Sequence, residues 1–401
     1  MRRLACFIAA ASAACTTSST SQPGAALQMN DLSVLFPMAT TQSELAAYLT
    51  PSSPGPDGPL LPEALYRSDP GAISLTGLRV VGFRLDPCFG AVGPIADAAT
   101  CDNQIRLIFQ PVFGDAPTAV HADDAAVHVM YALTRDQVIT AAREIAAARV
   151  AIDDSDLGPL AVHPLVARDG LTGALAQQLM AIAAKYADGT QIERITTFEM
   201  VTGGTGTSGG SGLGDIPVAW DMHGMTLASG VETPIAIPTL GAGTTQVSVN
   251  VTAAPLDSTF VPETTAPDNL DLLASASRAM TATPQARQAA YDAALRIENP
   301  NRHSADTIDC ASCHMAAPAR ALVGEPLFGL APTGNANAFV ADPGIPAADL
   351  AGSTAGLVDP ADAGINIHAF SYRFATPMIN QRVINETAAI LAYLRPLVAA
   401  D

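Results

Sequence analysis

The pattern of hydrophobic and polar residues divides the chain into a strand-rich part and a helical part. Between residues 79 and 252, short runs rich in β-branched and aromatic residues are separated by polar turns, which predicts strands. These runs are Arg79–Leu85, Gln104–Phe113, Val127–Leu133, Ile192–Val201, Ile216–Trp220, Thr233–Ile237 and Thr245–Thr252. Two Ala-rich segments with helical spacing, Arg135–Val150 and Gly173–Tyr186, predict helices inserted among the strands. We therefore expect a β-rich, sandwich-like α+β domain over residues 63–265.

The last third of the chain changes from strand to helical spacing. Leu270–Met280 and Pro284–Glu298 predict two helices, and Thr283 is a suitable N-cap ahead of the proline. The closing segment Asn380–Val398 predicts an amphipathic helix with one apolar face, formed by Val383, Ile384, Ala388, Leu391 and Leu394. This pattern predicts a multidomain protein in which an all-α domain over residues 266–401 follows the β-rich one.

The beginning of the chain has the layout of an export signal. Arg2 and Arg3 precede an apolar run that ends at Ala11, and small residues follow. Cleavage by an ordinary signal peptidase would use residues 11–13, whereas Ser12–Cys15 resembles a bacterial lipobox, in which Cys15 becomes the lipidated first residue. We prefer the lipobox, because the apolar run is short and a Ser/Thr-rich stretch follows it. Residues 1–15 are thus a predicted signal peptide. The protein is expected in the periplasm or, as a lipoprotein, at the outer membrane or cell surface.

Residues 16–62 are predicted to be a tether and linker. This stretch is rich in Ser, Thr, Pro and Gly, and a short helix is expected within it over Thr41–Leu49.

Charge and composition exclude two classes of partner. The chain has 38 acidic and 20 basic residues, a formal net charge of −18, so it lacks the basic surface that nucleic acid requires. No apolar run reaches the roughly 18–20 residues of a membrane-spanning helix. Contact with a membrane is therefore expected only through a lipid at Cys15, and a protein partner is expected to be basic.

The six cysteines fall into three pairs by position. Cys6 and Cys15 belong to the export signal. Cys88 and Cys101 lie between two predicted strands, and in an oxidising compartment they are expected to form a disulfide that contributes about 3 kcal/mol. The third pair, Cys310 and Cys313, stands apart near the end of the chain.

The third pair belongs to the strongest motif in the sequence. Residues 310–314 read Cys-Ala-Ser-Cys-His, the CxxCH pattern of covalent haem attachment. Two thiols at this spacing can form thioethers to the two haem vinyl groups, and the adjacent His314 then lies beneath the iron as the proximal ligand. Zinc would require two further ligands at matching spacing, and the sequence has no second CxxC or HxxxH. We therefore expect one haem c.

From residue 284 to 401 the chain resembles the class I, mono-haem cytochrome c family. The resemblance rests on a helix before the CxxCH motif, the motif itself, the stretch Gly324–Gly329 after it, and Met378 ahead of the closing helix. It implies that the carbonyl of Pro326 accepts a hydrogen bond from the His314 ring, and that the Met378 sulphur is the distal iron ligand. His368 is the main rival for that position, followed by His303, Met315 and a vacant sixth position.

The expected function is one-electron transfer in the bacterial envelope. A mono-haem cytochrome would pass electrons to and from redox partner proteins through the haem edge. Two further functions stay open, because the sequence assigns no role to residues 63–265. The haem could serve an oxidoreductase or peroxidase whose substrate binds the β-rich domain, or the protein could be a haem-based sensor.

Overall fold

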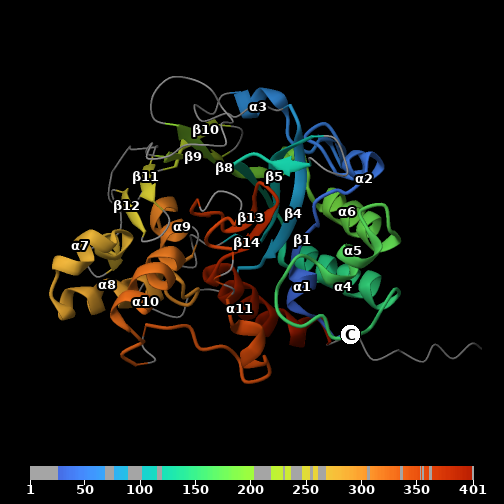
Figure 1. The fold of residues 1–401 in the computed structure, drawn as a ribbon. Coiled ribbons are helices and arrows are strands. Elements are labelled where there is room, and N and C mark those ends of the chain that lie inside the picture. The colour runs from blue at the N-terminus through green and yellow to red at the C-terminus, as the bar shows by residue number, and fades with distance from the viewer. Residues whose placement is uncertain are drawn as a thin grey trace, which may run out of the picture.

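The structure is a computed structural model. It describes residues 26–67, 76–88, 102–114, 120–202, 218–228, 231–235, 246–252, 256–260, 268–304, 308–334, 337–352, 354, 356–360 and 364–399. These residues form a mixed α+β fold around one large antiparallel sheet (Figure 1). The predicted signal peptide, Cys15 and Cys101 lie outside the described residues, so export, the lipid and the Cys88–Cys101 disulfide stay predictions.

Ten strands form the large sheet, in the order β1-β4-β5-β7-β8-β9-β11-β12, with β6 paired to β5 and β10 to β9. Their bounds are β1 (Ser33–Leu35), β4 (Leu78–Asp86), β5 (Gln104–Phe113), β6 (His121–Ala122), β7 (Ala125–Ala132), β8 (Ile192–Thr202), β9 (Val218–Ala228), β10 (Val231–Pro234), β11 (Gln246–Thr252) and β12 (Asp257–Phe260). Two short hairpins stand apart: β2 (Pro54–Gly55) with β3 (Gly58–Pro59), and β13 (Phe370–Arg373) with β14 (Thr376–Ile379).

The helices come from all parts of the chain. They are α1 (Met29–Leu32), α2 (Gln42–Ala47), α3 (Glu63–Arg67), α4 (Arg135–Val150), α5 (Pro164–Asp169), α6 (Ala174–Tyr186), α7 (Ala276–Thr281), α8 (Pro284–Ile297), α9 (Cys310–Pro318), α10 (Glu325–Phe328) and α11 (Gln381–Val398). A π-helical segment, η5 (Ala319–Gly324), joins α9 to α10. Among the described residues, no helix has the length and apolar character needed to cross a bilayer.

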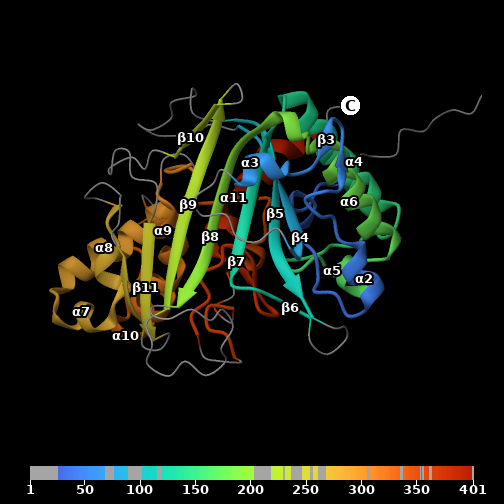
Figure 2. The ribbon, with the colours of Figure 1, turned by 90° about the horizontal axis from the view of Figure 1, so that it is seen from above.

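The expected sandwich is wrong for the described strands, which form a single broad sheet with a different cover on each face. Helices α4 and α6 pack on one face, and the chain after residue 268 covers the other (Figures 1 and 2). Strand β5 shows the reason: every residue from 105 to 112 is buried, so both of its faces need a cover. Alternate residues of the strand contact the cover on one face and the cover on the other, since successive side chains point to opposite faces.

On strands β7 and β8, two large hydrophobic clusters reflect this alternation. Val127 of β7 and Ile195 of β8 belong to the cluster that contains α4 and α6. Ala126 and Phe198 of the same strands belong to a second cluster, shared with α8 and α9. The first cluster also includes Leu391 and other residues of α11. The predicted boundary near residue 265 therefore does not separate two hydrophobic cores, and the hairpin β13–β14 shows that the C-terminal part is not entirely helical.

Residues 26–62, the described part of the predicted tether and linker over residues 16–62, pack against the rest of the fold. Leu27, Leu32, Leu35 and Leu60 are at most 1% exposed, and β1 pairs with β4. The Pro and Gly residues of this stretch make turns within the core region, because apolar residues between them bury against the sheet and α4.

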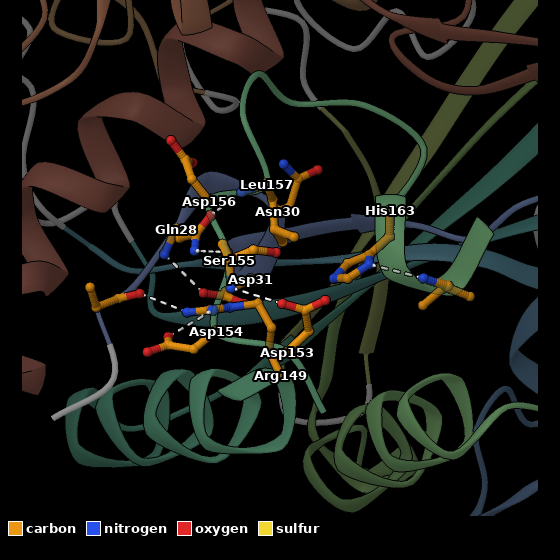
Figure 3. A network of polar contacts seen from close by, with 12 residues as sticks. Gln28, Asn30, Asp31, Arg149, Asp153, Asp154, Ser155, Asp156, Leu157 and His163 are labelled. Carbon is orange, nitrogen blue, oxygen red and sulfur yellow. Dashed lines mark hydrogen bonds and ion pairs between the residues drawn. The ribbon is translucent and has the colours of Figure 1, made fainter. Parts of the chain in front are cut away.

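A buried polar network holds the start of this segment (Figure 3). Nε of Arg149, at the end of α4, donates to the Asp31 carboxylate at 2.9 Å, and its Nη2 donates to the Ala26 carbonyl at 2.7 Å. The other oxygen of Asp31 accepts from the Gln28 N–H at 2.8 Å. Both charged side chains are fully buried, so each depends on the other for compensation.

Removing Arg149 should destabilise the fold strongly. Arg149→Ala leaves the Asp31 carboxylate buried without its counter-ion, a loss of about 3–5 kcal/mol in the free energy of unfolding. Arg149 also contacts Asp154, whose side chain is 69% exposed. The control Asp154→Asn should therefore change the free energy by less than about 1 kcal/mol. Urea denaturation measures both variants, and equal losses would contradict the anchoring role of Arg149.

His163 should make the protein less stable in mild acid. Burial and the nearby Arg149 lower the pKa of His163 to about 4, and its Nδ1 accepts the Val166 N–H at 3.4 Å. The unfolded chain, with a histidine pKa of about 6.5, binds the proton more readily in this range. The contribution to stability is therefore complete above about pH 6.5 and is lost as the pH falls towards 4, by about 3 kcal/mol.

The variant His163→Asn tests this pH dependence. Asparagine retains an N-cap acceptor for α5 but cannot titrate. Its free energy of unfolding, measured in urea at several values between pH 4 and 7, should vary less than that of the parent protein. Parallel pH profiles for the two proteins would refute the assignment to His163.

Candidate functional site

The CxxCH motif forms the first turns of helix α9. The Asp309 carboxylate accepts the Ser312 N–H at 2.9 Å, which caps the helix at its N-terminus. Cys310, Cys313 and His314 then occupy positions i, i+3 and i+4, which lie on one face of a helix. The local sequence therefore dictates that both thiols and the imidazole point the same way.

This face of α9 is directed at the sheet. Cys310 and Cys313 pack at the edge of the cluster that contains Phe198 and Met222. Arg194 of β8 acts electrostatically on Cys310, whereas Arg382 of α11 acts on Cys313. Within the motif, Cys310 is therefore nearer to β8, in the middle of the sheet, and Cys313 is nearer to α11.

Both motif thiols are free and protonated. They are the free cysteines among the described residues. Burial, with smaller contributions from Cys313 and Asp309, raises the pKa of Cys310 to about 12, and burial also raises the pKa of Cys313. Neither thiol is a ready nucleophile in the folded chain, since the thiolate is the reactive form.

The His314 ring is held in the tautomer that a metal ligand requires. Its Nδ1 lies 2.6 Å from the Ile367 carbonyl oxygen, so Nδ1–H donates and Nε2 keeps its lone pair. Burial outweighs this hydrogen bond and lowers the pKa of His314 to about 4, with a further contribution from His368. The imidazole is therefore neutral near pH 7.

The hydrogen-bond acceptor differs from the one expected. Pro326 was predicted to accept from His314, but the structure gives this bond to Ile367. Pro326 lies in α10 with its side chain exposed. The segment that follows α10 returns to the motif at residues 365–368 and brings a different carbonyl to Nδ1.

A buried network fixes the segment that carries the Ile367 carbonyl. The ring of His368 contacts Asp124 through Nε2 at 2.6 Å and Ser371 through Nδ1 at 2.5 Å. Arg373 donates to the Ile365 carbonyl and lies 3.5 Å from Asp124. His368 and Ser371 are at most 1% exposed, so substrates have no route to this Ser–His–Asp set. Its role is to join β13 to the turn before β7.

The side chains predicted as distal iron ligands are engaged in other contacts or buried elsewhere. Both ring nitrogens of His368 are engaged, and Nε2 of His303 lies 3.4 Å from Asp268. Met378, on β14, is buried against Ala317 and Leu357 in a small cluster of its own. Met315 is fully buried in the cluster beneath α9.

A small, partly open pocket of about 20 Å³, with room for about one water molecule, lies between α9 and the sheet. Its lining includes His128, Thr196, Phe198 and Met222 from the sheet, and Cys310 and His314 from α9. The Phe198 ring lies between two imidazoles, with centroids 5.2 Å from His314 and 4.6 Å from His368. This pocket is more than tenfold smaller than the roughly 300–1,000 Å³ of cofactor pockets, so a bound porphyrin requires α9 and the sheet to move apart.

The sheet residues of this cavity were not predicted from the sequence. In the sequence, His128 shows no ligand spacing. One signal was available, because β7 alternates between Val127, Val129 and Tyr131 on one face and Ala126, His128 and Met130 on the other. A histidine on the second face of a buried strand indicates that something polar covers that face.

Side chains of the described residues form no group of three or more His, Cys, Asp or Glu suited to a metal ion. Comparison with protein-family models, with curated proteins and with solved structures found no match.

The motif thiols should resist alkylation in the folded, cofactor-free chain. With its pKa raised to about 12, Cys310 holds about a thousandth of the thiolate of a normal cysteine at pH 8, although that thiolate is more nucleophilic. Iodoacetamide should therefore react on the order of 100-fold more slowly with the folded chain than with the chain in urea. Mass spectrometry of timed samples measures the rates, and equal rates would show that the fold does not protect the thiols.

Proposed function

We infer that the protein is an exported mono-haem c-type cytochrome that carries single electrons in the bacterial envelope. The observation that supports this most directly is the geometry of His314. A CxxCH histidine whose Nδ1–H is bound by a backbone carbonyl has its Nε2 lone pair available for iron. When bound, the haem supplies an iron that cycles between the ferrous and ferric states.

The chain contributes three functions to such a site. Cys310 and Cys313 hold the haem covalently, and His314 is the proximal ligand. Phe198 and Met222, which are at most 5% exposed, line the site and exclude water. The donor set suits haem, because it combines two free thiols and one neutral imidazole on one helix face.

Electron transfer also needs a partner and a location. The net charge of −18 favours a basic redox partner protein. Export suits the same function, since c-type haem is attached outside the cytoplasm, and the predicted lipid at Cys15 would keep the carrier at a membrane surface.

Covalent haem attachment tests the proposal. The full chain, produced in a bacterium with a c-type maturation system, should carry haem that survives denaturing electrophoresis and stains in the gel. Cys310→Ser with Cys313→Ser should lose that haem, because both thioethers are removed.

Ser312→Ala is the matched control. It lies between the two cysteines, and its buried hydroxyl has no hydrogen-bond partner among the described residues. The control should retain the haem. A parent protein without covalent haem, or a double serine variant that keeps it, would refute the proposed function.

A further inference from the structure

Helix α9 and the sheet place a second imidazole at the cavity. His128 and His314 both line it, one from β7 and one from α9. His128 pairs across the sheet with Thr196, which makes Phe198 its diagonal neighbour on the same face. Such diagonal neighbours lie about 7–8 Å apart, and the Phe198 ring contacts His314. The Phe198 side chain is therefore a neighbour of both imidazoles.

We propose that His128 is the second axial ligand of the haem iron, so that the iron is held between α9 and the sheet. This inference rests on the proposed function and adds the identity of the sixth ligand. It would make residues 120–202 part of the haem site, and the β-rich part of the chain would thereby acquire a role.

The bonding state of His128 supports this assignment. Its ring makes no hydrogen bond or ion pair with the part of the chain that the structure describes. At the wall of the pocket, its ring nitrogens therefore have no partner among the described residues. Coordination to iron would provide that partner. Met222, also in the lining, is 2% exposed and packs with Trp220 and Phe198, so its thioether needs none.

The other candidates are engaged elsewhere. Both ring nitrogens of His368 are engaged by Asp124 and Ser371, and His303 is paired with Asp268. Met378 lies outside the cavity lining. Its sulphur packs closely against Gly356. Bringing Met378 to the iron would require β14 to leave its pairing with β13.

Spectroscopy of the purified holoprotein tests the inference. The parent protein should be low-spin in the ferric state and should lack a sulphur-to-iron charge-transfer band. In His128→Ala the ferric iron should become high-spin and the ferrous iron should bind CO, and added imidazole should restore the low-spin spectrum by filling the vacated space. Met378→Leu should leave the spectrum unchanged.

His128→Met gives a second, positive readout. It preserves a side chain of similar reach and offers a sulphur, so it should create the charge-transfer band and raise the reduction potential. If the His128 variants leave the spectrum unaltered, or if the parent shows a band that is lost in Met378→Leu or Met222→Leu, His128 is not the ligand. In each of these outcomes the haem is still attached, whereas failure of the proposed function would show as absence of covalent haem in the parent.

Discussion

The fold depends on one constraint: the central strands bury both of their faces. Strands β4 and β5 are buried almost throughout, so the sheet is stable only if each face is covered. Helices α4 and α6 cover one face. The chain after residue 268 covers the other, and α11 adds contacts to α1 and α4 at the edge. The CxxCH segment is therefore a structural cover of the sheet as well as a candidate cofactor site.

This arrangement also determines the electrostatics of the site. Arg84, Arg106 and Arg194 lie in one row across the sheet, on the face that α9 covers. Two of them are paired in the interior: Arg84 lies 3.0 Å from Glu386, and Arg106 lies 2.9 Å from Asp86. Burial would raise the pKa of Glu386, but Arg84, Arg382 and Arg106 lower it to about 2, so it stays ionised. Charges thus surround a site whose own histidines are neutral.

Under the proposed function, the tight packing around the motif affects the stage of folding at which haem is attached. In the folded chain both thiols are half-buried with raised pKa values, and the pocket beside them is small. Thioether formation needs reactive thiols and room for a porphyrin. Haem attachment is therefore expected before α9 docks on the sheet, after which Phe198 and the segment carrying the Ile367 carbonyl enclose the proximal histidine.

Local patterns in the sequence determined most of the elements. Strand β5 and helix α4 have the predicted bounds, Thr283 and Asn380 cap α8 and α11, and CxxCH marks the motif helix, because propensity, capping and hydrophobic period act over a few residues. Only the tertiary structure decided that one sheet serves both halves of the chain, that Ile367 binds His314, and that His128 faces the motif. These contacts join segments 53 or more residues apart, and they depend on strand pairing and on which face of the sheet each segment covers, which local spacing does not encode.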